Sequence, residues 1–79
     1  MTWEKFRDEM LKKEKDGVKK YKVNGNNDGF IFRSSKTYGG QLFVFTDNRC
    51  MYMMNWCGPV LLFHSLTFDG MMKIFNEIK

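Results

Sequence analysis

The sequence predicts an α+β fold of two layers: an N-terminal helix, a meander sheet of four or five antiparallel strands, and a C-terminal helix. Apolar residues at helical spacing occur only at the two ends of the chain. The segment between them contains short runs rich in β-branched and aromatic residues, separated by glycine, asparagine, aspartate and proline. Because the chain has only 79 residues, we expect a single domain over residues 1–79 with a thin core.

The N-terminal helix is expected to begin after Thr2, whose hydroxyl is a good N-cap, and to end at Gly17. Its apolar residues form one stripe, namely Trp3, Phe6, Met10 and Leu11. Ser65 or Thr67 is expected to cap the C-terminal helix. The apolar residues of that helix recur at intervals of three and four, namely Phe68, Met71, Met72, Phe75 and Ile78.

Five strands are expected between the helices. They span residues 18–23, 30–34, 41–46, 50–56 and 60–64, with turns at 24–29, 38–40, 47–48 and 58–59. The 24–29 turn, NGNNDG, also has oxygen-bearing side chains at alternate positions, as the first half of a calcium loop does. Ser35 stands where that loop needs a bidentate glutamate, so we interpret the segment as a hairpin turn.

Several predicted strands are apolar on both faces, most clearly at residues 42–45 and 60–63. A sheet with one face in water normally alternates apolar and polar residues, and two short helices can cover only one face. Two explanations remain open at this point. The sheet curls strongly around itself, or its second face is buried against another molecule.

These features favour a small non-enzymatic binding protein that contacts a larger protein, or a second copy of itself as a homodimer, through the sheet face. Methionine adapts to irregular surfaces, while tyrosine, tryptophan and arginine dominate binding hot spots. The predicted partner-binding residues are therefore Arg49, Tyr52, Met53 and Trp56.

In size and composition the chain resembles the small inhibitors that bacteriophages use against host enzymes or defence systems such as CRISPR. That resemblance implies an inhibitor acting in the host cytoplasm.

The alternative function is nucleic-acid or nucleotide binding. The net charge is +4, and the excess of basic groups lies between residues 17 and 36. Basic and aromatic side chains together can contact phosphates and stack on bases. The predicted nucleic-acid-binding residues are Lys19, Lys20, Tyr21, Lys22, Arg33 and Lys36. The same lysines would also protect a sheet edge against aggregation, which is the competing interpretation.

Other functional classes find little support. No apolar run approaches the roughly 18 residues of a membrane span. The N-terminal segment carries acidic residues where a signal peptide would be apolar. We therefore expect a cytoplasmic location without membrane contact. Cys50 and Cys57 are interpreted as reduced thiols. Together with His64 they lie at intervals of seven, unlike zinc ligands. We therefore expect no metal, no cofactor and no catalytic residue.

Overall fold

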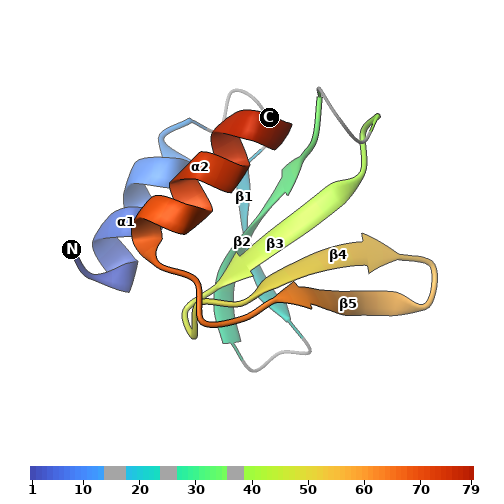
Figure 1. The fold of residues 1–79 in the computed structure, drawn as a ribbon, viewed down its shortest axis with the longest axis horizontal. Coiled ribbons are helices and arrows are strands. Elements are labelled where there is room, and N and C mark those ends of the chain that lie inside the picture. Colours follow the sequence, from blue (N-terminus) through green and yellow to red (C-terminus); the bar gives the residue numbers. More distant parts are fainter. Residues whose placement is uncertain (14–17, 24–26, 36–38) are drawn as a thin grey trace.

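The computed structural model describes residues 1–13, 18–23, 27–35 and 39–79. Its helices are α1 (Trp3–Leu11) and α2 (Phe68–Ile78), and its strands are β1 (Lys19–Val23), β2 (Asn27–Arg33), β3 (Leu42–Thr46), β4 (Met51–Asn55) and β5 (Gly58–Phe63). Each strand pairs antiparallel with the next, in the order β1-β2-β3-β4-β5 (Figure 1). The predicted α+β fold with a meander sheet is confirmed.

Both helices begin at a threonine cap. The Thr2 hydroxyl accepts a hydrogen bond from the Lys5 N–H at 3.2 Å. The Thr67 hydroxyl accepts one from the Gly70 N–H at 2.9 Å, so Thr67 rather than Ser65 is the cap of α2. Helix α1 ends at Leu11 instead of continuing to Gly17, which itself lies outside the described residues. Leu11 is the last apolar residue of the stripe, and the charged residues after it have no apolar face to bury.

Two predicted boundaries in the sheet were wrong. Strand β2 begins three residues earlier than expected, because Asn27 and Asp28 still pair with β1. The turn between β4 and β5 lies at residues 56–57 rather than at Gly58-Pro59, since Gly58 already pairs with Asn55. The Asn55 carboxamide oxygen accepts a hydrogen bond from the Cys57 N–H at 2.8 Å, and this Asx turn closes the hairpin.

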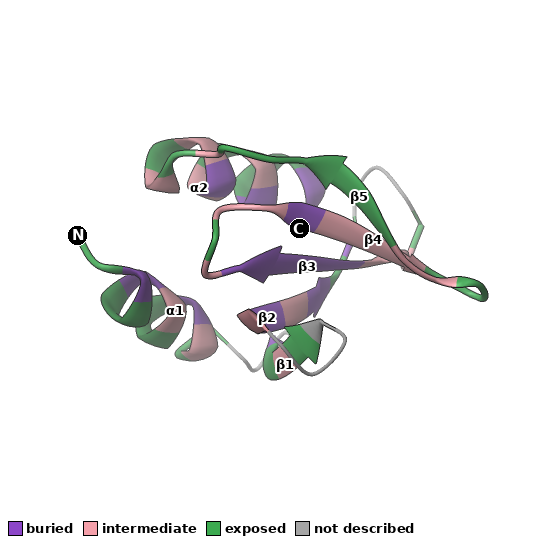
Figure 2. Ribbon diagram, turned by 90° about the horizontal axis from the view of Figure 1, so that it is seen from below, coloured by how far each residue is buried: buried purple, intermediate pink, exposed green. Residues whose placement is uncertain are grey.

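Both helices pack on one face of the sheet, where the core is strongly aromatic (Figure 2). The ring of Phe32 lies 5.3 Å from that of Phe45 and 4.9 Å from that of Phe75 on α2. On the other side of the core, the ring of Phe6 on α1 lies 5.9 Å from that of Phe30. The rings of Phe6 and Phe68 are 5.2 Å apart, so the two helices also contact each other.

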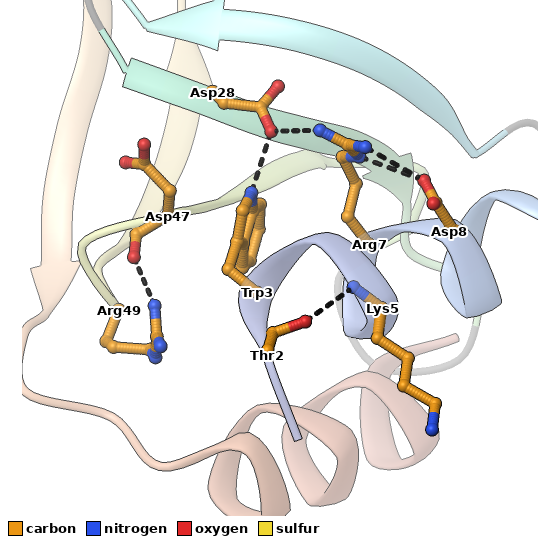
Figure 3. Close-up of polar contacts among 8 residues, drawn as sticks. All are labelled: Thr2, Trp3, Lys5, Arg7, Asp8, Asp28, Asp47 and Arg49. Carbon is orange, nitrogen blue, oxygen red and sulfur yellow. Dashed lines mark hydrogen bonds and ion pairs between the residues drawn. The ribbon is translucent and has the colours of Figure 1, made fainter.

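Asp28 fixes α1 to the sheet (Figure 3). One of its carboxylate oxygens accepts a hydrogen bond from the Trp3 indole N–H at 2.7 Å and another from the Arg7 guanidinium at 2.6 Å. Partial burial on its own raises the pKa of Asp28, but these two hydrogen bonds outweigh it, so the pKa lies below its usual value. The Asp28 side chain that accepts these hydrogen bonds is therefore the ionised carboxylate.

The face of the sheet away from the helices is partly closed by the curl of the sheet itself. Ile31, Val44, Tyr52 and Leu61 form one cross-strand row on this face. Val44 in the middle of that row has no solvent exposure, although neither α1 nor α2 lies on this face. At Gly29 in β2 the backbones approach so closely that a Cβ atom would lie 2.5 Å from the main-chain oxygen of Phe45. The curl thus accounts for part of the doubly apolar pattern, whereas Leu61 at the edge of the row stays 49% exposed. Burial of this face against another molecule stays a prediction.

Replacing Asp28 with asparagine should lower the free energy of unfolding at pH 7 by about 1.5 kcal/mol, because the ion pair with Arg7 is lost. Since the pKa of Asp28 is lowered by folding, its contribution is complete above the unfolded pKa of about 4 and disappears as the pH falls through the folded pKa. Urea unfolding at pH 7 and pH 2 should show a smaller acid loss in D28N than in the unaltered chain. Glu9→Gln, at an exposed position of α1, is the matched control, and an equal acid loss in D28N would contradict the role of this carboxylate.

Replacing Gly29 with alanine should lower the free energy of unfolding by about 1–3 kcal/mol, because β2 and β3 must separate to admit the methyl group. Thermal unfolding followed by circular dichroism measures the loss. Gly39→Asn is the control: Gly39 has a φ of +58°, a Cβ atom there would have no neighbour within 4 Å, and asparagine tolerates that conformation. Equal stability of G29A and the unaltered chain would show that the close approach is not required.

Candidate protein-binding surface

Strand β5 lies at the open edge of the sheet and exposes a continuous set of large apolar side chains. Val60, Leu61, Leu62 and Phe63 are between 39% and 52% exposed, and Trp56 in the preceding turn is 95% exposed. Figure 2 shows the strand as exposed along most of its length, whereas β3, on the far side of β4, is largely buried. We call the side chains of Trp56, Val60, Leu61, Leu62 and Phe63 the β5 surface.

The exposure of β5 follows from the position of the strand in the sheet. On the helix-covered face, Phe30, Phe45, Met51 and Phe63 form one cross-strand row. The first three are at most 1% exposed, whereas Phe63 is 52% exposed. The side chains are of similar character throughout, so the difference arises because the helices cover the row only as far as β4.

A bulge directs two consecutive apolar side chains of β5 to the same side. Met51 pairs with Phe63 and Tyr52 with Leu61, so Leu62 has no partner on β4. An extra residue of this kind interrupts the alternation of side chains along a strand. Leu62 and Phe63 therefore both face the space between β5 and α2, instead of pointing to opposite faces.

That space is a cavity of about 220 Å³. Phe43 and Met51 on the sheet form one part of its lining, Leu62 and Phe63 a second, and Ile74, Glu77 and Ile78 on α2 a third. It lies in the wedge between α2 and the β4–β5 hairpin, which projects past the helices (Figure 1). The β5 surface thus combines a protruding apolar residue at one end of the strand with an apolar recess at the other.

The hairpin and the segment that follows it carry no formal charge. Between Cys50 and Phe68 there is no aspartate, glutamate, lysine or arginine, although 28% of the whole chain is charged. Burying this surface against another molecule therefore removes no ionised side chain of the hairpin from water, which would be costly.

The free edge of β5 is poorly suited to continuing the sheet. Asn55 and Gly58 flank the two-residue turn and form the hydrogen-bonded pair that closes it. Because hydrogen-bonded and non-hydrogen-bonded pairs alternate along antiparallel strands, the main-chain groups of the next residue, Pro59, point away from β4 toward the open edge. Proline has no N–H to donate there, and the bulge at Leu62 interrupts the edge further along. Both devices prevent strand addition in natural sheets. A partner at this edge would therefore contact mainly the side chains.

The structure does not bring the four predicted partner-binding residues into one patch. Trp56 is exposed in the turn, but Met53 packs against the core on the helix-covered face and Tyr52 is half-buried on the opposite face. Arg49 lies beyond the other end of β4, where its guanidinium is 4.2 Å from the centre of the Phe68 ring and donates to the main-chain oxygen of Asp47 (Figure 3). The residues missing from that prediction are those of β5. Their signal was the apolar segment 60–63 in the last strand of a meander.

The predicted basic residues are also divided. Lys20 pairs with Phe30 and Lys22 with Asp28, which places them on the helix-covered face, while Lys19 and Tyr21 lie on the other. Arg33 donates a hydrogen bond to the main-chain oxygen of Gly40 at 2.6 Å. Lys36 lies outside the described residues. Nucleic-acid binding by this set stays a prediction.

The residues that resemble metal-binding patterns in the sequence have other roles or lie apart in the described part of the chain. Asp28 of the calcium-like segment is bound by Trp3 and Arg7, and residues 24–26 lie outside the described part of the chain. Cys50 and Cys57 are free thiols at opposite ends of β4, and the His64 ring contacts the Ser65 hydroxyl at 3.0 Å. Within the described residues, no group of three or more histidine, cysteine, aspartate or glutamate residues is placed to hold a metal ion.

No protein-family model matches the chain, and neither the curated proteins nor the solved structures give a match. In the part of the chain that the structure describes, no helix has the length and apolar character needed to cross a membrane. The functional argument therefore rests on the geometry of the β5 surface.

Because the basic residues of β1 lie on opposite faces of the sheet, nucleic-acid binding can be tested separately for each face. If one face binds nucleic acid, either Lys19→Glu or the pair Lys20→Glu and Lys22→Glu should weaken the binding, but not both to the same extent. Gel retardation of RNA and DNA at low salt measures this, and retardation should weaken steeply as salt is raised. The absence of any retardation of the unaltered chain at low salt would exclude the alternative.

Proposed function

We propose that this chain is a non-enzymatic protein-binding module that docks through the β5 surface. The observation that supports the proposal most directly is the exposure of Trp56 and of four consecutive large apolar residues on β5. Contiguous apolar surface that is exposed on a folded protein commonly marks an interaction site. In this proposal the chain acts by occupying the surface of another protein molecule.

The size of the surface is in the range that binding requires. The exposed fractions of the five side chains correspond to roughly 600 Å² of accessible surface, compared with about 800 Å² per partner in a standard interface. Half-buried neighbours such as Tyr52 and Met54 extend it on the same hairpin. Trp56 is the expected hot spot, because a large aromatic ring that becomes fully desolvated contributes strongly to affinity.

The chemistry of the surface also fits a protein partner better than a polyanion. The segment from Cys50 to Phe68 has no lysine or arginine to contact phosphates. Its binding energy would come from apolar burial, at about 25 cal/mol for each Å² removed from water, and would depend little on salt. An inhibitory role against a host or defence enzyme is one form that such docking could take, and it stays a prediction.

Photo-crosslinking from β5 tests the proposal. With Leu61 replaced by p-benzoylphenylalanine, irradiation in the cells of origin should yield adducts with protein, either another copy or a different chain. The same replacement of Lys5, which is exposed on α1, should yield none or far fewer. Circular dichroism confirms that both variants fold. Equal yields from the two positions, or no adduct from position 61, would contradict the proposal.

A further inference from the structure

The β5 surface carries both members of a complementary pair. Trp56 projects almost fully exposed from the turn before β5, and the cavity beside α2 is lined by Leu62 and Phe63 at the end of β5. At about 220 Å³ this cavity is smaller than the roughly 300–1,000 Å³ of sites for small-molecule ligands. A recess of this size, with mostly apolar walls, suits a single large apolar side chain.

The two features are positioned so that two copies of the chain could use them reciprocally. In an isologous interface, residue i of one copy meets residue j of the other, and j meets i. If two β5 strands lie antiparallel about a two-fold axis between Pro59 and Val60, Gly58 of each copy falls opposite Leu61 of the other, and the 56–57 turn of each copy lies near the Leu62–Phe63 end of the other. Each Trp56 then lies beside the Phe63 wall of the other copy's cavity.

The charge pattern permits this self-association. A two-fold axis brings a surface against its own copy, so a charged strand would face like charges. The absence of any formal charge from Cys50 to Phe68 avoids that repulsion between the two β5 strands, and Glu77 of the cavity lining would meet the uncharged Trp56 ring rather than its own copy. The net charge of +4 on each copy acts only at longer range, where salt screens it.

The accessible area of the β5 surface limits the size of an interface between two copies. Two copies of the β5 surface together offer roughly 1,200 Å², the lower end of the range for specific interfaces. Proline at the centre of the edge prevents a continuous ladder of main-chain hydrogen bonds across the axis. Affinity therefore depends on the side chains, and on the two Trp56 contacts above all.

From these observations we infer that the occupant of the β5 surface is a second copy of this chain, bound antiparallel so that each Trp56 enters the other's cavity. This inference rests on the proposed function and names its partner. In this arrangement Trp56 of one copy contacts the cavity wall that contains Ile74 of the other copy.

Sedimentation equilibrium of the purified chain tests the inference. The mass should rise from 9.4 kDa toward twice that value between about 1 and 300 μM, and raising the salt should not weaken association. Trp56→Ser should raise the dissociation constant at least tenfold, whereas Lys5→Ser should not change it. A mass of 9.4 kDa throughout would overturn the inference; if crosslinking from position 61 still captured other proteins, the proposed function would stand without it.

A mixing experiment tests whether the insertion is reciprocal. Trp56→Ser keeps the cavity, while Ile74→Glu keeps the tryptophan but replaces an apolar part of the cavity wall with a second carboxylate beside that of Glu77. Each variant alone should be largely monomeric, and an equimolar mixture should regain dimers, because one complete contact is restored. Should circular dichroism show that I74E is unfolded, Leu62→Gln, which alters the exposed wall, takes its place. Undiminished dimerisation of a folded cavity variant, or no recovery on mixing, would overturn reciprocal insertion.

Discussion

The structure depends on how far two short helices can cover a sheet of five strands. Helices of 9 and 11 residues supply the apolar stripes that bury one face, and their ring contacts converge on Phe30 and Phe32 of β2. Their coverage ends at β4: along one cross-strand row Met51 is 1% exposed and its neighbour Phe63 is 52% exposed. The buried core and the exposed β5 surface are thus two consequences of the same limit.

The placement of the helices decides which edge remains open. Asp28 in β2 binds Trp3 and Arg7, so α1 is held over the β1–β2 side of the sheet. Helix α2 meets α1 through Phe68 and the sheet through Phe75. It diverges from the β4–β5 hairpin, and the cavity lies in the resulting wedge. The two helices, held in this way, leave the β5 edge of the sheet uncovered.

The sequence predicts the elements of this fold well, because each has a local signal: two apolar stripes of helical period, threonine caps, and strand runs between turn residues. It predicts exposure poorly. Val44, Tyr52 and Leu61 are apolar or aromatic residues of one cross-strand row, yet Val44 is fully buried, Tyr52 half-buried and Leu61 49% exposed. What separates them is their distance from the sheet edge and the curl at Gly29, and neither is a local property.

The same reasoning explains why the four residues predicted to bind a partner do not lie together in the structure. Residue type favoured Arg49 and Met53, but the cation of Arg49 is engaged by Phe68 and Met53 packs against the core. Conversely, the roles of Pro59 and Leu62 become visible only when the pairing of β5 with β4 is known. Pro59 removes an N–H donor from the free edge, and Leu62 forms a bulge. An apolar edge strand without such devices would invite sheet extension and aggregation. With them, β5 exposes apolar side chains while its backbone resists strand addition, which is the combination that the proposed docking requires.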